Sequence, residues 1–317
     1  MNSPLLVLMF FLAAQWAAAQ DIQVQQIRRN VFLLAGDGAN ITLHVEPAPG
    51  EESHDSVFGG DAGVLVVDSG LVAKSAQLLA AIRGLSKGPL RYIINTSAGT
   101  DHVGGNEALT KASGGIVRGA LGGRPAGPPL MILAHEQVLE QMANAPVDAQ
   151  PTDAFATTKE VFFNGGSIQV IHIPAAHSAG DSIVYFRRSD VIAAGELFST
   201  VGFPRFDPKQ GGSIDGVLAG LNRILELAIP GEKEQGGTMI VPAHGRLSDE
   251  ADVAYHREMV QIIRDRVEAG IRSGKTLEQI RAARPALEYE KRYSQMDWTA
   301  DMFVGAIYQS LALARLK

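Results

Sequence analysis

Blocks of apolar residues separated by polar turns run along most of this chain and predict strands and helices in succession. Short apolar runs bounded by turn residues are typical of buried strands. Strands are predicted at 31–34, 41–45, 63–67, 92–94, 131–134, 161–163, 168–171, 181–186, 191–194 and 239–242. Because helical spacing falls between several of these runs, their order predicts a sheet with helices packed outside it.

Apolar residues three and four positions apart predict the helices. A helix over 73–83 is expected to end at Gly84, and another is expected over 136–144. The most regular apolar stripe lies in 214–228, where Ser213 precedes the first helical residue and is a good N-cap.

The character of the chain changes after residue 249, where predicted strands no longer occur. Val260, Ile263, Val267 and Ile271 mark a long helix that Gly274 ends. The residues 276–279 resemble a capping box, and 303–314 is helical again. The C-terminal part is therefore predicted to be helical.

Composition narrows the classes of function. The chain has 317 residues, of which 46% are hydrophobic, so a globular protein with a large core is expected. A net charge of −6 and the lack of any Lys/Arg run argue against a nucleic-acid surface. With no cysteine, the chain has no disulfide, no thiolate nucleophile and no Cys zinc site.

The first twenty residues carry no charged side chain, and 5–14 is one apolar run too short to span a bilayer. Ala17, Ala18 and Ala19 form a small-residue cleavage site. We therefore expect residues 1–19 to be a signal peptide, with the mature protein secreted or periplasmic and without a stable membrane anchor. The alternative is an uncleaved anchor.

Glycine and proline dominate the segment 114–129, which includes Gly122-Gly123 and Pro128-Pro129. This composition is typical of a surface loop. A lid over a substrate is the alternative, and the role of the segment stays open.

A polar segment at 95–106 follows the apolar run 92–94 and precedes helical residues, which is where α/β folds place their chemistry. It contains Asp101 and His102, followed by Gly104 and Gly105. This segment resembles the metallo-β-lactamase superfamily, whose pattern here is Thr-His-x-His-x-Asp-His-x-Gly-Gly. Two histidines of that pattern are absent, because Ser97 and Gly99 stand in their places.

Three later segments resemble further ligand-bearing blocks of the same superfamily. His177, within 173–182, stands where the third histidine of the first metal site is expected. Glu196 replaces a bridging aspartate after the run 191–194. His244 follows Pro242 and Ala243 in a turn resembling Pro-Gly-His-Gly.

The resemblance implies an α/β fold, a four-layer αββα sandwich of the metallo-β-lactamase type with a C-terminal helical extension. The blocks that carry it cover most of 31–246. We accordingly expect a metallo-β-lactamase-like domain over 20–249 and the helical extension over 250–317.

The resemblance also implies two metal sites, and the side chains present fit only one of them. Of the first site only His177 remains, and one imidazole does not hold zinc against water. For the second site, Asp101, His102 and His244 offer two imidazoles and a carboxylate, and Glu196 adds another oxygen. Such a set suits one zinc ion, or Fe(II) or Mn(II), with Asp101 also the candidate catalytic residue.

Each candidate also has a simpler interpretation. Asp101 could cap the following helix, and His102 and His244 could be packed, hydrogen-bonded histidines. His177 is a substrate hydrogen-bonder, a residual ligand or a structural residue. Asp68, at the end of a predicted strand, is expected to orient the ligand-bearing loop from outside the ligand set.

Five histidines lie outside these blocks: His44, His54, His135, His172 and His256. They are expected in the core or at the surface. His172 is the exception to examine, because its closeness to His177 in sequence makes it a candidate substitute ligand.

Two hypotheses follow. The first is an exported hydrolase with one metal ion, which activates water against an ester, lactone, thioester or amide of a small molecule. The second is a non-catalytic protein of the same fold that binds a partner or has a structural role, with no metal cofactor. The sequence does not predict the oligomeric state.

Overall fold

The computed structural model describes residues 22–36, 38–47, 62–114, 129–231 and 236–315. The expected signal peptide 1–19, His54 and nearly all of segment 114–129 lie outside the described residues. No helix within the described ranges has the length and apolar character needed to cross a membrane.

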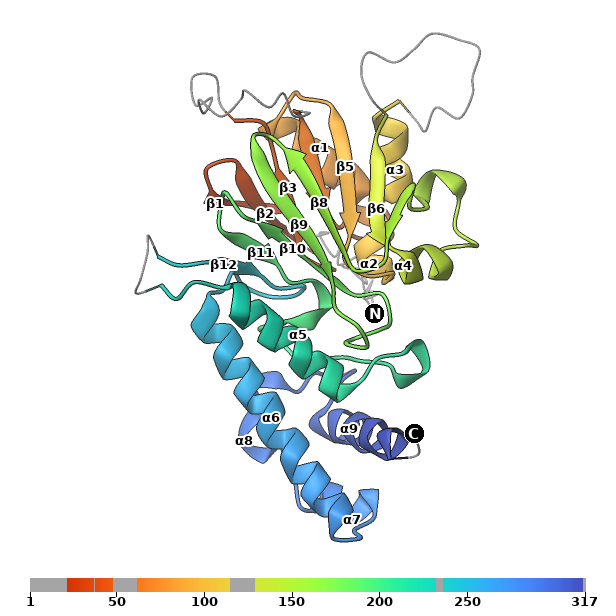
Figure 1. Ribbon diagram of the computed structural model, residues 1–317, viewed down its shortest axis with the longest axis vertical. Coiled ribbons are helices and arrows are strands. Elements are labelled where there is room, and N and C mark those ends of the chain that lie inside the picture. The colour runs from red at the N-terminus through yellow and green to blue at the C-terminus, as the bar shows by residue number, and fades with distance from the viewer. Residues whose placement is uncertain (1–21, 37, 48–61, 115–128, 232–235, 316–317) are drawn as a thin grey trace, which may run out of the picture.

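The described strands form two sheets packed face to face (Figure 1). The first has seven strands in sequence order, antiparallel from β1 to β4 and parallel from β4 to β7. They are β1 (Gln23–Arg28), β2 (Val31–Ala35), β3 (Ile41–His44), β4 (Val64–Val67), β5 (Leu90–Asn95), β6 (Met131–His135) and β7 (Asp153–Phe155).

The second sheet has five described strands in the order β12-β11-β10-β9-β8, and only β11 and β12 run parallel. They are β8 (Thr158–Phe163), β9 (Gly166–His172), β10 (Ser182–Phe186), β11 (Val191–Ala193) and β12 (Met239–Val241). The expected hairpins at 161–171 and 181–194 are both confirmed by the antiparallel pairing.

Side-chain alternation along the strands explains the layers. In β4, Leu65 and Val67 join a cluster between the two sheets with residues such as Phe163 and Val184. Val64 and Val66 join a second cluster on the outer face of the first sheet. All four residues are buried, as expected for a strand covered on both faces.

Helices cover the outer faces of both sheets (Figure 1). The first sheet carries α1 and α3, and α5 lies against the second. The described α-helices are α1 (Ser75–Leu85), α2 (Thr100–Val103), α3 (Asn106–Ala112), α4 (Glu136–Gln141), α5 (Ile214–Leu227), α6 (Glu250–Arg272), α7 (Leu277–Ala282), α8 (Leu287–Tyr293) and α9 (Ala300–Ala314). The short 3-10 helices η2 (Val72–Lys74), η3 (Val147–Ala149), η4 (Gly195–Leu197) and η5 (Pro208–Gln210) lie in the connections.

Several cap predictions are confirmed. The Ser213 hydroxyl accepts a hydrogen bond from Gly216 N (2.9 Å) at the start of α5. The capping box at Thr276 is present, and Gly274 ends α6 in the left-handed conformation with φ of +73°. Gly84, however, does not end α1, which continues to Leu85.

One further expectation is wrong, and one alternative interpretation is excluded. The helix after β6 ends at Gln141, short of the predicted residue 144. Asp101 caps no helix, because Gly99 and Gly105 occupy the N-cap positions of α2 and α3 and neither helix has a side-chain cap.

Strand β1 was not predicted from the sequence. Its residues Gln23 to Gln26 are exposed, so no apolar alternation marks it, and it pairs at the edge of the sheet.

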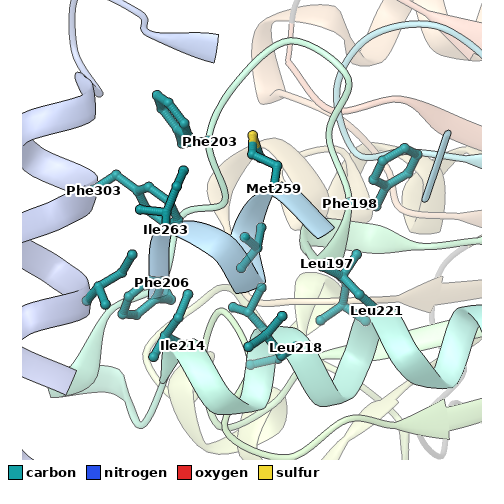
Figure 2. Packing of buried hydrophobic residues seen from close by; sticks show 14 of the residues in the cluster. Leu197, Phe198, Phe203, Phe206, Ile214, Leu218, Leu221, Met259, Ile263 and Phe303 are labelled. Carbon is teal, nitrogen blue, oxygen red and sulfur yellow. The ribbon is translucent and has the colours of Figure 1, made fainter. Parts of the chain in front are cut away.

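The largest apolar cluster joins the second sheet, α5 and the C-terminal helices into one core. Figure 2 shows Phe203 and Phe206 from the loop after η4 beside Phe303 of α9, and Leu218 and Leu221 of α5 near Leu197. Phe203 stacks on Phe303, with ring centroids 5.0 Å apart. The C-terminal helices therefore share their core with the sheets.

Hydrogen bonds tie the loop 199–206 to the turn before α9. Phe203 N donates to Tyr293 O (3.2 Å), and Trp298 Nε1 donates to Pro204 O (3.2 Å). The Arg205 guanidinium pairs with the Asp297 carboxylate at 2.8 Å. This loop is thus held from the side by the C-terminal helices.

The same loop holds the turn that contains His244. Thr200 N donates to His244 O (3.0 Å), while the Thr200 hydroxyl accepts from Arg246 N (3.0 Å). Gly245, between them, has φ of +100°, and a Cβ there would lie 1.9 Å from Thr200 Oγ1. Only glycine fits this close approach.

His256 of α6 is enclosed in the shared core. Its ring meets Phe198 and Tyr293 edge-on, and neither ring nitrogen has a hydrogen-bond partner. Burial, with a smaller contribution from Arg292, lowers the pKa of His256 to about 3. This histidine is therefore neutral in the folded protein at neutral pH.

Replacing His256 with Phe should make stability less sensitive to acid. The ordinary pKa is 6.5, so below that pH the unfolded chain binds a proton that the folded chain excludes until about pH 3. The free energy of unfolding must then fall as pH drops through this window, by up to about 1.4 kcal/mol per pH unit from this group. Urea titrations from pH 7 to 4 should give a shallower fall for His256→Phe than for the native chain. Parallel curves would contradict this account.

Gly245→Ala should destabilise the fold more than Gly274→Ala does. Both positions have positive φ, but a Cβ at Gly274 meets nothing within 4 Å. The control should lose about 1 kcal/mol of unfolding free energy, the cost of the left-handed backbone alone. Gly245→Ala should lose about 3 kcal/mol or more, because it adds overlap with Thr200. Chemical denaturation measures both, and equal losses would show that the overlap relaxes without cost.

Candidate metal centre

Four strand ends meet at one edge of the sandwich and bring the predicted residues together. Asp68 follows β4, Thr96 follows β5, Glu196 follows β11 in η4, and His244 follows β12. The sheets are joined here by a hydrogen bond from Ser182 N to Thr96 O (2.9 Å). Side chains from both sheets therefore reach one place.

Asp68 organises the base of this cluster. Its carboxylate accepts hydrogen bonds from Thr96 N (2.8 Å) and the Thr96 hydroxyl (2.7 Å). The same carboxylate lies 2.8 Å from His102 Nδ1. Asp68 is 3% exposed and has φ of 61°, a strained backbone for a residue with a side chain. Asp68 orients His102 through Nδ1, the ring nitrogen that points away from the cluster, as expected for a residue outside the ligand set.

His102 lies in the short helix α2, which packs tightly on the turn after β4. A Cβ on Gly105 would lie 2.2 Å from Ser69 O, so only glycine permits this contact. Ser69 N donates to His102 O (2.7 Å) and fixes the backbone at the imidazole.

Glu196 closes the other side of the His102 ring. Its Oε1 lies 2.7 Å from His102 Nε2 and 3.4 Å from His244 Nε2. Asp101 Oδ2 lies 3.5 Å from the same His244 nitrogen. One donor atom from each of Asp101, His102, Glu196 and His244 lies within 4.8 Å of the other three.

The charges of the cluster reinforce one another. Burial alone would lower the pKa of His102, but Asp68 and Glu196 outweigh it and raise that pKa well above its ordinary value. Burial would raise the pKa of Glu196, yet the hydrogen bonds from His102 and His244 hold it well below its ordinary range. The carboxylate of Glu196 is therefore ionised and faces positive charge.

The positions expected to have lost their ligands are filled by local contacts. Ser97 is buried, and its hydroxyl accepts a hydrogen bond from Gly99 N (3.2 Å). A Cβ on Gly99 would lie 3.1 Å from both Asp101 Oδ1 and His102 Cδ2. Little space is left there for a side chain.

His177 stands apart from the four clustered donors. Its Nδ1 lies 3.5 Å from Asp181 Oδ1 and makes no hydrogen bond. Burial lowers the pKa of His177, but Asp181 and Glu196 reverse this and raise it. The charge of Glu196 thus affects the pKa of His177, although His177 is not one of the four clustered donors.

His172 does not substitute for a ligand. Its ring stacks on His135 with centroids 3.6 Å apart, and its Nδ1 donates to Asp181 O (3.0 Å). His44 and His256 are buried in the core.

Sequence reasoning missed two threonines. Thr96 binds Asp68, and its place directly before Ser97 in the motif could have indicated a role. Thr200 holds the turn of His244, and no local sequence signal links residues so far apart along the chain.

The donor set fits a single metal ion. Two imidazoles and two carboxylates from three separate segments converge, and these are ligand types of zinc sites. A catalytic zinc ion keeps three protein ligands and one position for water, so three of the four donors would be enough to hold it. The N–O separations of 3.4 and 3.5 Å suit two ligands of one ion at 2.0–2.2 Å in tetrahedral geometry. The 2.7 Å contact between His102 and Glu196 is a direct hydrogen bond, so these two atoms must separate slightly around an ion.

The fold is also found in solved structures. The sec-alkylsulfatase Pisa1 from Pseudomonas sp. is 14% identical with a TM-score of 0.62, over 91% of this chain and 50% of that one. A metallo-β-lactamase from Pontibacter korlensis is 16% identical with a TM-score of 0.54, over 76% and 99%. The DIM-1 metallo-β-lactamase is 14% identical with a TM-score of 0.55, over 76% and 98%. At these identities the similarity concerns the fold alone, and the chain spans half the length of the alkylsulfatase.

Curated protein sequences contain no match to this chain. A family model described as the metallo-beta-lactamase superfamily matches residues 49–251, more than half of the sequence. Together with the αββα layers and the cluster at the strand ends, this match establishes that the chain belongs to the metallo-β-lactamase superfamily.

Proposed function

We propose that this protein is an exported hydrolase that uses one metal ion held by Asp101, His102, Glu196 and His244. The observation that carries the proposal is the convergence of these four donors within 4.8 Å of one another. Zinc is the first candidate, and Fe(II) or Mn(II) suits the same oxygen and nitrogen donors. Members of the superfamily are hydrolases, which supports the reaction class.

Bound in this cluster, the ion would supply a Lewis acid that activates water for attack on a carbonyl of a small ester, lactone, thioester or amide. Asp68 would keep the Nδ1 proton of His102 in place and so direct Nε2 toward the ion. Asp101, with a quarter of its side chain exposed, is the most exposed carboxylate of the set, and its second oxygen would accept a hydrogen bond from the substrate or the attacking water. His177 would hydrogen-bond the substrate from beside the cluster.

A non-catalytic role on the same fold is the competing proposal, and one observation favours it. Asp68, His102 and Glu196 already form a chain of contacts at 2.8 and 2.7 Å. A protonated His102 satisfies both carboxylates, so the centre is stable without any metal. A protein of this kind would bind no ion and would keep its biological effect after Asp101→Ala.

Metal content and the choice of variant distinguish the two proposals. Chelated protein reloaded with zinc, iron and manganese in separate samples should retain about one ion per chain. His244→Ala should weaken metal affinity by more than about 100-fold, beyond what losing a residue behind a ligand costs. His177→Ala is the matched control and should keep the ion, because it lies outside the donor cluster.

Hydrolysis of a panel of chromogenic esters, lactones, thioesters and amides should be lost in His244→Ala. In His177→Ala it should persist with a raised KM. Native protein that retains none of the three metals, with its fold intact by circular dichroism, would eliminate the hydrolase proposal.

Restoring both missing histidines should not restore a second metal. Ser97→His with Gly99→His places two rings where Ser97 is buried and a Cβ on Gly99 already crowds Asp101 and His102. The double variant should lose about 1–3 kcal/mol of unfolding free energy and still bind at most one ion. Gly99→Ala is the control: its loss of unfolding free energy measures the crowding at Cβ alone, without the imidazole ring that Gly99→His adds. A count of two ions per chain by elemental analysis would contradict the prediction.

A further inference from the structure

Asn40 holds the turn that carries His244 at three points. Its side-chain amide donates hydrogen bonds to Pro242 O (3.0 Å) and to Gly245 O (2.9 Å), and its backbone N donates to Ala243 O (2.7 Å). These carbonyl groups lie on both sides of His244 in the chain. Asn40 therefore fixes the backbone before and after this imidazole.

The side chain of Asn40 is committed to this turn. A side-chain amide has two N–H groups, and both are used here. Asn40 is only 8% exposed, so the two hydrogen bonds are largely shielded from water and are stronger than the same contacts at the surface. Without these donors, the carbonyl groups of Pro242 and Gly245 would lose their partners, which costs free energy in a buried place.

Asn40 ties the turn of His244 to the first sheet. It directly precedes β3 of the first sheet, whereas His244 follows β12 of the second. The hydrogen bond from Thr200 N to His244 O (3.0 Å) acts within the second sheet, because Thr200 and Glu196 both follow β11. The Thr200 contact thus places His244 relative to Glu196, and the Asn40 contacts place it relative to the first sheet.

The first sheet also carries the other two donors that face His244. Asp101 and His102 lie in α2, which follows β5, and Asp101 Oδ2 lies 3.5 Å from His244 Nε2. The β2–β3 connection reaches this helix as well, since a Cβ on Gly38 would lie 3.4 Å from Asp101 Cβ. The segment that contains Asn40 therefore lies beside Asp101 while it holds the turn of His244.

We propose that Asn40 is a positioning residue of the metal centre, which sets the distance of His244 from Asp101 and His102. This role rests on the proposed function, because it concerns the ion that these donors would share. A ligand whose backbone is held in place beforehand has less freedom to lose when the ion binds. Residues that orient ligands from outside the ligand set typically contribute about 10- to 100-fold to metal affinity.

Asn40→Ala removes both side-chain hydrogen bonds and should raise the dissociation constant for zinc by about 10-fold or more, measured by chelator competition on the full chain. Asn164→Gly is the matched control. Asn164 is 6% exposed, and its amide joins the two sheets through Gly63 (3.0 and 3.1 Å) at the start of β4, the end of that strand away from Asp68. Glycine is the replacement because Asn164 has φ of 50°. The control should lose stability and keep the native zinc affinity.

Hydrogen exchange of metal-free protein, followed by NMR, tests the same role without any ion. The amide of Ala243 lies in the turn and donates to Phe198 O (3.0 Å). In Asn40→Ala this amide should exchange about 10-fold faster or more, relative to the amides of α5, because the turn opens more often. Asn164→Gly should leave that ratio unchanged. Asn40→Ser keeps one side-chain donor, should give a smaller effect in the same direction, and carries both measurements if Asn40→Ala does not fold.

The two measurements separate a failure of this role from a failure of the proposed function. Unchanged zinc affinity in the Asn40 variant overturns the positioning role, whatever the exchange rate. Equal weakening of zinc binding in Asn164→Gly assigns the effect to a general loss of stability and overturns the role as well. If the native protein binds no zinc, the exchange of the Ala243 amide decides alone, and an unchanged ratio shows that Asn40 does not hold the turn of His244.

Discussion

The buried carboxylate of Asp68 is the contact on which the rest of the centre depends. It joins the end of β4 to the end of β5 through Thr96 and aligns His102 above them. An ionised carboxylate away from water must be met by donors, and three meet it here. The strained backbone at Asp68 persists because these hydrogen bonds hold it. The position of His102, and through it that of Glu196, follows from this arrangement.

Ser97 and Gly99, which stand where the family pattern has two histidines, are packed by local contacts. The backbone of Gly99 lies close to Asp101 and His102, and Gly99 N donates a hydrogen bond to the Ser97 hydroxyl. Glu196 contacts the imidazole of His102 directly. The clustered donors and Asp68 therefore form a connected network in which the His102 imidazole lies between two carboxylates. Such a network is compatible with one metal ion and equally with a protonated His102 between Asp68 and Glu196, so metal content distinguishes the two proposals.

Much of this structure could be predicted from the sequence, for physical reasons that particular residues illustrate. The runs at 64–67 and 239–241 are apolar because both of their faces are covered, so strand patterns mark them clearly. Since parallel strands end at the same edge, residues that follow them could be expected to meet. The exposed strand β1 carried no such pattern. The hydrogen bond from Thr200 N to His244 O joins residues that are far apart in the sequence, so no local pattern predicts it.

The attachment of the loop 199–206 has a consequence for how the molecule responds to change. His244 is held by Thr200, whose loop contacts Tyr293 at the end of α8 and Asp297 and Trp298 in the turn before α9. A displacement of the C-terminal region would therefore act first on His244, because Asp68 and His102 are held by the ends of β4 and β5 in the other sheet. The C-terminal region thus supports the position of one imidazole of the cluster, and a change in its packing would alter the spacing of the four donors without replacing any of them.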